Sequence, residues 1–132
     1  MGDTPPLAYV YDRCVTDSLV NLELRLSALG EYATERRWGW GGWFVDYGDA
    51  ALTANDRPEF EAMLRAIESA GPGVERLCLV HNWGRLSHDT GHRQTFTRRI
   101  LTAGAWLETI DGESARIGAA PDGRLTSGPV IA

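Results

Sequence analysis

The chain has 132 residues, a formal net charge of −5, 43% hydrophobic residues and 23% charged residues. These proportions exclude wholesale disorder and predict one domain, residues 1–132, that is large enough to bury its own core. No apolar run approaches the roughly 20 residues that span a bilayer, and no signal peptide is visible, so we expect no membrane association. All 13 basic residues are arginine. The acidic balance argues against a chain that binds nucleic acid unaided.

The two cysteines, Cys14 and Cys78, both lie in apolar segments with the length of strands. We interpret them as reduced core residues of a cytoplasmic protein, and a disulfide between them is the alternative.

Apolar periodicity predicts alternating strands and helices along the chain. The expected strands cover 7–11, 40–45, 77–80 and 105–110. The first expected helix covers about 18–37, where Leu19, Leu22, Leu26, Leu29 and Ala33 form one stripe. The second begins after a cap at Asp56, buries Phe60, Leu64 and Ile67, and ends at 71–73. The third covers about 89–103 and buries Phe96, Ile100 and Ala103, and a hairpin between 115–118 and 125–126 is expected around Asp122 and Gly123.

This order predicts an α/β domain with a mostly parallel sheet of about four strands and helices on both faces. Ligand-facing residues of such sheets gather just beyond the carboxyl ends of the strands. Arg13, Arg57 and Arg85 fall in three of those places. Three guanidinium groups at one sheet edge would form an anion site, to which phosphate is well suited. The alternative is that these arginines are solvated or pair with nearby acids.

The same residues carry a resemblance to a known family. The pattern Tyr11-x-Arg13 followed by Thr16 and a leucine-rich helix resembles the Tyr-x-Arg-x-Ser-Thr opening of serine recombinases, the resolvase/invertase family. The further matches are Tyr32-Ala33 with Arg37-Trp38, Phe44 to Asp46, Arg57 to Phe60, Leu79-Val80 with Gly84 to Asp89, and Gly104 to Leu107 with Ile110 to Gly112. The resemblance covers about residues 8–114 and implies the catalytic-domain fold of that family.

The resemblance implies a function in DNA strand cleavage and exchange. We expect no cofactor and no metal ion. The family attacks a phosphodiester with a serine hydroxyl, and arginines stabilise the charge on the phosphorus oxygens. Arg13, Arg57 and Arg85 match family arginines, and Asp46 matches the acidic residue after the second strand. Tyr11, Ser87 and His88 lie within the matched motifs as supporting positions.

Several positions depart from the family pattern. Val15 occupies the position of the nucleophilic serine and has no hydroxyl. Gly84 replaces an aspartate, and His88 replaces an arginine. Thr16 would point to the opposite face of an extended segment from residue 15, which leaves Ser87 as the more plausible substitute hydroxyl. The pattern indicates an impaired enzyme that keeps part of a phosphate-binding site.

The tail after Gly112 shows no long amphipathic helix, so we expect no family dimer helix and no C-terminal DNA-binding domain. The leading hypothesis is a recombinase-family protein that binds DNA weakly and acts with, or competes against, an active recombinase or another protein. An alternative is a protein-interaction module with no nucleic-acid role. A third is a small-molecule phosphoesterase that uses Ser87 or a water activated by His88.

Three other patterns have competing interpretations. His81, His88 and His92 with Asp89 could bind Zn²⁺, although they read more simply as polar turn residues. Segment 85–99 is basic and could contact DNA or form a solvated helix face. The indoles between 38 and 43 and at position 83 could stack on a base, but we expect them in the core.

Overall fold

In the computed structural model, residues 4–14, 19–47, 57–87 and 89–116 are described. The elements follow the order expected from the periodicity. The strands are β1 (Leu7–Cys14), β2 (Gly39–Tyr47), β3 (Arg76–Val80), β4 (Trp106–Thr109) and β5 (Ser114–Ala115). The helices are α1 (Leu19–Glu35), α2 (Pro58–Ser69), the short 3₁₀ helix η2 (Trp83–Arg85) and α3 (Thr90–Ala103).

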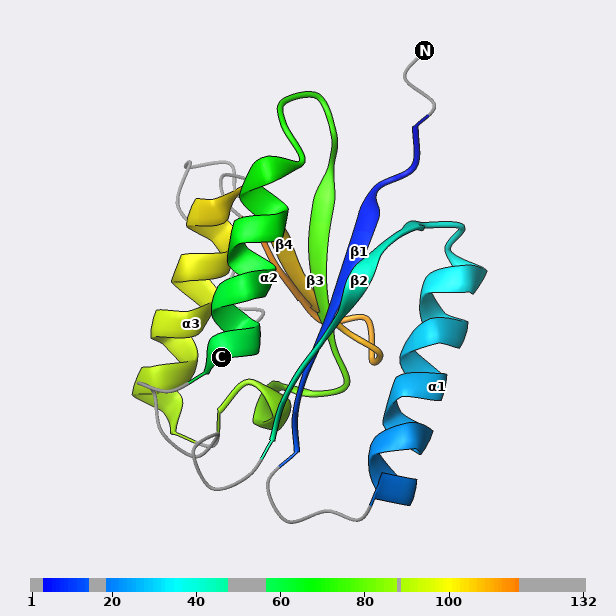
Figure 1. Ribbon diagram of the computed structural model, residues 1–132, viewed down its shortest axis with the longest axis vertical. Helices are drawn as coiled ribbons and strands as arrows, with labels where there is room; N and C mark the ends of the chain where they lie inside the picture. The colour runs from blue at the N-terminus through cyan, green and yellow to red at the C-terminus, as the bar shows by residue number, and fades with distance from the viewer. Residues whose placement is uncertain (1–3, 15–18, 48–56, 88, 117–132) are drawn as a thin grey trace.

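The strands form one sheet in the order β2-β1-β3-β4-β5. The first four are parallel, and β5 runs antiparallel to β4. Helix α1 covers one face of the sheet, and α2 and α3 cover the other (Figure 1). The predicted α/β class and the helices on both faces are therefore confirmed, and the sheet has five strands rather than four.

Two predicted strand boundaries are wrong in a way that matters for function. The strand β1 extends to Cys14 rather than ending at residue 11, and β2 extends to Tyr47 rather than ending at residue 45. The two strands stay paired to their last residues, so that Arg13 lies beside Asp46. Both polar side chains are consequently held on the sheet and not on a loop.

The predicted hairpin around Asp122 and Gly123 lies almost wholly outside the described residues. Its first residue, Ala115, pairs with Leu107 in β4 instead. The expected helix cap, Asp56, also lies outside the described residues.

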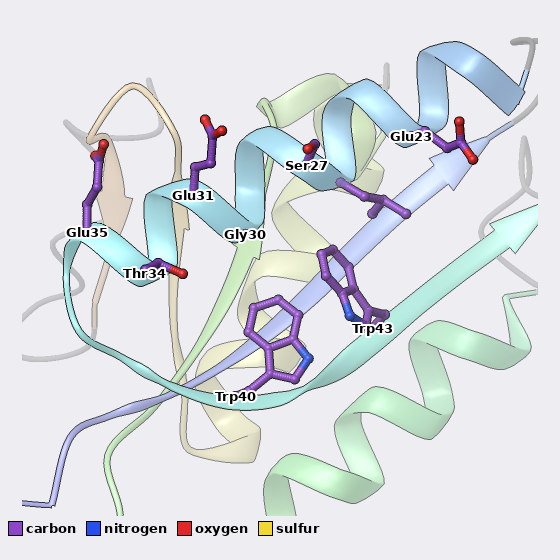
Figure 2. Close-up of a pocket in the computed structure, with 9 residues that line it drawn as sticks. Glu23, Ser27, Gly30, Glu31, Thr34, Glu35, Trp40 and Trp43 are labelled. Atoms are coloured by element: carbon purple, nitrogen blue, oxygen red, sulfur yellow. The ribbon is translucent and has the colours of Figure 1, made fainter.

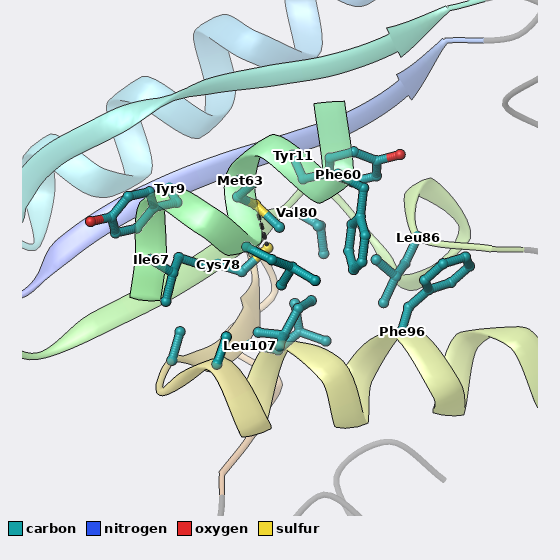
Figure 3. Close-up of a cluster of buried hydrophobic side chains, with 14 of the residues drawn as sticks. Tyr9, Tyr11, Phe60, Met63, Ile67, Cys78, Val80, Leu86, Phe96 and Leu107 are labelled. Atoms are coloured by element: carbon teal, nitrogen blue, oxygen red, sulfur yellow. Dashed lines mark hydrogen bonds between the residues drawn. The ribbon is translucent and has the colours of Figure 1, made fainter. Parts of the chain in front are cut away.

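The larger core fills the space between the sheet and the helices α2 and α3 (Figure 3). The rings of Tyr11, Phe60 and Phe96 form its aromatic spine, with centroid separations of 5.3 Å and 5.0 Å in edge-on contacts. Its other members include the predicted Leu64, Ile67, Ile100 and Ala103, and also Met63 and Cys78. Burial of these faces is the main force that holds the two helices on the sheet.

A smaller core lies under α1, and a buried carboxylate closes it at one side. Ala8, Val10, Leu29, Ala33 and Leu79 are among its apolar members. The carboxylate of Glu108 in β4 accepts hydrogen bonds from Tyr32 Oη (2.6 Å) and from Trp106 Nε1 (2.9 Å). The bond from Tyr32 ties the C-terminal part of α1 to β4, while the bond from Trp106 lies within β4.

Cys14 and Cys78 are both buried, as expected for core residues. Burial raises the pKa of the Cys78 thiol, which keeps it protonated. In the part of the chain that the structure describes, no helix is long and apolar enough to cross a membrane.

Candidate anion-binding site

The structure brings the three predicted arginines together at the carboxyl edge of the sheet. Arg13 lies near the end of β1, Arg57 immediately precedes α2, and Arg85 ends η2 after β3. The Arg13 guanidinium donates to the carbonyl of Gly84 at 3.0 Å, and Arg85 Nη1 donates to the carbonyl of Arg13 at 2.9 Å. This reciprocal pair of hydrogen bonds fixes η2 against the end of β1.

The Arg57 side chain extends from the start of α2 to the segment that follows η2. Its Nη1 donates to the carbonyl of Leu86, and its guanidinium lies over the Phe96 ring, 4.1 Å from the centroid. The stacking on a ring face orients the planar cation. Arg13 and Arg57 are 2% and 3% exposed, so the cluster is recessed below the surface formed by the described residues.

Asp46 acts as a helix cap supplied from the sheet. Its Oδ1 accepts from the backbone N–H of Glu59 at 2.9 Å, and its Oδ2 accepts from the N–H of Phe60 at 3.1 Å and from Tyr11 Oη at 2.8 Å. Arg57, at the N-cap position of α2, makes no side-chain cap hydrogen bond. A carboxylate at a helix N-terminus also interacts favourably with the helix dipole. The start of α2, and Arg57 with it, is thereby fixed to β1 and β2.

Tyr11 is held in its neutral form. Burial raises its pKa, and the nearby Asp46 carboxylate raises it further, while the Arg57 guanidinium opposes the shift. At neutral pH the phenol therefore acts as a hydrogen-bond donor to Asp46.

Asp12 and Arg25 complete the network, and the sequence reasoning did not single them out. Asp12 is fully buried on the α1 side of β1 and accepts two hydrogen bonds from Arg25, at 2.7 Å and 3.2 Å. Arg85 Nη1 lies 3.8 Å from the same carboxylate. Position 25 follows the buried Leu22 by three residues and precedes the buried Leu29 by four, so the helical spacing already placed it on the buried side.

Positive charge is concentrated in this network. The guanidinium groups of Arg13, Arg57 and Arg85 lie close enough to influence one another, and Arg25 and Arg85 both lie near the Asp12 carboxylate. Burial lowers the pKa of Arg13, and the positive charges of Arg57 and Arg85 lower it further. Several guanidinium groups gathered at one edge are able to bind an anion.

Of the remaining predicted positions, Ser87 is among the described residues. Ser87 is buried, and its Oγ accepts from the backbone N–H of Asp89 at 3.1 Å. Val15, Thr16 and His88 lie outside the described residues. Cys14, the residue before Val15, alternates with Arg13 along β1 and so belongs to the opposite face of the sheet.

The basic segment 85–99 does not form one uniform patch. Arg85 belongs to the cluster, and Arg99 makes two hydrogen bonds to the Glu61 carboxylate of α2, at 2.8 Å and 2.6 Å. Arg98 remains exposed on α3. In the described residues no group of three or more histidine, cysteine or acidic side chains could hold a metal ion.

One family of known proteins matches nearly the whole chain. The family described as "Resolvase, N terminal domain" matches residues 8–128. The chain belongs to this family. Its members are serine recombinases, which act in site-specific recombination. A search of curated proteins gave no significant match.

Solved structures with the same fold are themselves recombinase domains. A resolvase family site-specific recombinase from Streptococcus pneumoniae has 21% identity and a TM-score of 0.65, with 93% of this chain and 77% of that chain covered. The N-terminal catalytic domain of TP901-1 integrase has 18% identity and a TM-score of 0.68, with coverage of 89% and 85%. The C-terminal catalytic domain of an IS607-like serine recombinase has 21% identity and a TM-score of 0.64, with coverage of 79% and 69%. At sequence identities of 18–21%, this similarity shows that the chain shares the fold of these domains.

Proposed function

We propose that this serine-recombinase domain binds the phosphate backbone of DNA through Arg13, Arg57 and Arg85 and does not cut it. The observation that carries the proposal is the convergence of three arginines at the carboxyl edge of the sheet, two of them almost fully buried. A phosphodiester is negatively charged, and its oxygens accept hydrogen bonds from forked guanidinium groups.

The absence of cutting rests on the nucleophile position. Val15 has only methyl groups and cannot form a phosphoester. Ser87 is a poor replacement because it is buried and its hydroxyl already accepts a hydrogen bond. Such a domain would act as a non-cutting partner or competitor of an active recombinase.

A second candidate is a protein-interaction domain with no nucleic-acid role. It is favoured by the hydrogen bonds of the cluster, in which guanidinium groups of Arg13, Arg57 and Arg85 donate to main-chain carbonyls. In that case the arginines would serve to hold η2 and α2 on the sheet.

The first test compares two variants with the same change of net charge. Arg57→Gln with Arg85→Gln alters the cluster, and Arg37→Gln with Arg65→Gln alters exposed arginines elsewhere. Binding of a fluorescent DNA duplex is measured by anisotropy at low salt, where phosphate contacts are strongest. We expect the cluster variant to lose at least about tenfold in affinity, and more than its control, because hydrogen bonds between charged groups are lost. Equal losses in the two variants would favour the second candidate.

The second test addresses cutting. The wild-type chain and the Val15→Ser variant are incubated with labelled DNA and separated on a denaturing gel. We expect no covalent adduct with the wild type. An adduct formed by the wild-type chain would refute the proposal that Val15 removes the nucleophile.

A further inference from the structure

The exposed large hydrophobic side chains of the described residues are confined to two neighbouring elements. They are Val20 (61% exposed) and Leu24 (64%) on α1, and Trp40 (42%), Trp43 (44%) and Tyr47 (59%) on β2. We call this surface the α1–β2 face. Helix α1 is the only described helix on its side of the sheet, and β2 is an edge strand (Figure 1). Concentration of exposed apolar side chains on one face marks an interaction site more often than scattered exposure does.

The two indoles lie on the same side of β2 because the strand contains a bulge. Trp40 pairs with Ala8 and Trp43 pairs with Val10, so Gly41 is an extra residue opposite the Ala8–Tyr9 step. Without it, residues three apart in a strand would point to opposite faces. The ring centroids of the two indoles are 4.4 Å apart. The expectation that these indoles are core residues is wrong, since both are exposed to solvent.

The glycines of the bulge are required by its geometry. A Cβ atom at position 41 would lie 2.7 Å from the ring of Tyr9, which is closer than packed atoms tolerate. Gly42 has a φ angle of 136°, which side chains other than hydrogen rarely allow. The sequence Trp40-Gly-Gly-Trp43 therefore encodes the paired presentation of two indoles.

A groove of about 960 Å³ runs between α1 and these indoles (Figure 2). Trp40 and Trp43 lie on its β2 side, and Glu23, Glu31 and Glu35 lie along its α1 side. The single basic residue of α1, Arg25, directs its guanidinium to the buried Asp12 instead. The groove is thus both aromatic and acidic.

We propose that the α1–β2 face binds an amphipathic segment of a partner protein that carries arginine or lysine. The apolar side of such a segment would cover Val20, Leu24 and the indoles. Its cationic side chains would lie over the indole faces and pair with the glutamates, because indoles and carboxylates both attract cations. Extension of the sheet by an added strand is less suitable, since the bulge interrupts the regular edge of β2. The acidic groove would repel DNA phosphates, so this surface is independent of the arginine cluster.

The probe is a fluorescein-labelled amphipathic peptide composed of leucine and arginine, and its partner probe has glutamate in place of arginine. Binding of both to the full chain is measured by anisotropy at physiological salt. The groove variant is Glu31→Gln with Glu35→Gln. Its control, Glu59→Gln with Glu68→Gln, changes the net charge equally on α2, across the sheet. Thermal melting of each variant confirms that it folds.

We expect the arginine peptide to bind and the glutamate peptide not to bind. The groove variant should weaken binding at least about fivefold more than its control, as expected for two lost exposed ion pairs. Trp43→Leu, which keeps an apolar side chain, should weaken binding about threefold through loss of the cation–π contact. Equal effects of the groove and control variants would overturn the proposal. So would a dimer in sedimentation that Trp43→Leu dissociates, because the face would then be an interface between copies of this chain.

Discussion

Asp46 offers the sharpest test of how the site is held together. In Asp46→Ala the N–H groups of Glu59 and Phe60 lose their acceptor, which is the loss of a helix cap and costs about 1 kcal/mol, with a range of roughly 0.5–2. The buried Tyr11 hydroxyl also loses its partner, and an unsatisfied buried group costs about 1–3 kcal/mol. We therefore expect the free energy of unfolding to fall by about 2–4 kcal/mol.

The measurement is urea denaturation, and the chain provides its own control. Asp89 caps α3 by accepting from the N–H of His92 at 2.8 Å, but its side chain is exposed and binds no buried hydroxyl. Asp89→Ala should cost less than Asp46→Ala, because it removes only the cap. In a Tyr11→Phe background, Asp46→Ala should cost less than in the wild type, because no hydroxyl is then left unsatisfied. Equal costs for Asp46→Ala and Asp89→Ala would refute the assignment of Asp46 as a three-bond anchor.

Three further predictions concern the bulge, the phenol of Tyr32 and the buried ion pair. Gly41→Ala should destabilise the fold by about 1–3 kcal/mol in urea denaturation, because its Cβ would overlap the Tyr9 ring, and no loss would contradict the bulge geometry. Burial and the hydrogen bond to Glu108 raise the pKa of Tyr32 from 10.0 to about 12. Between these two pH values the unfolded chain loses a proton that the folded chain keeps, so the free energy of unfolding falls as the pH rises. Tyr32→Phe should make that fall smaller between about pH 9 and pH 12, and an unchanged pH profile would contradict this. Asp12→Asn should lower the free energy of unfolding by about 3–5 kcal/mol, because it leaves the Arg25 cation without its carboxylate. Adding Arg25→Met should restore much of that free energy, and no recovery in the double variant would show that the cost arises elsewhere.

The order of helices and strands could be predicted from the sequence because the spacing of apolar residues is a local pattern, set by which face of each element is buried. Phe60, Ile67, Phe96 and Ile100 were all placed in the core from spacing alone, and each is buried. The boundary of β1 was missed for the opposite reason. Asp12 and Arg13 are charged, and a charged pair suggests a loop unless its long-range partners are known.

Those partners are distant in the sequence. Asp12 is neutralised by Arg25 of α1, and Arg13 donates to Gly84, 71 positions away. The cap of α2 shows the same limit: local rules pointed to Asp56, while the described acceptor is Asp46 on β2. Contacts of this kind follow from how strands and helices meet, which no local pattern records.

The position of the candidate site could be predicted from the sequence, but the burial and hydrogen bonding of its arginines could not. The rule that parallel strands gather ligand-facing residues at their carboxyl ends predicted that Arg13, Arg57 and Arg85 would lie at one edge of the sheet, and they do. It did not predict that Arg13 and Arg57 would be almost fully buried, or that backbone carbonyls would accept their hydrogen bonds. The pairing of Trp40 with Trp43 was also hidden, because a strand bulge breaks the period of two on which the sequence reasoning relied.

The proposed contact between the arginine cluster and DNA phosphate can be tested directly. Because all 13 basic residues are arginine, an NMR spectrum of the arginine Nε–H groups monitors every basic side chain at once. The spectrum is recorded during titration with a DNA duplex at low salt, and signals are assigned with single Arg→Lys variants. We predict that the signals of Arg13, Arg57 and Arg85 shift together as DNA is added and that these shifts reach saturation. Shifts confined to exposed arginines such as Arg98, or no shifts at all, would contradict it.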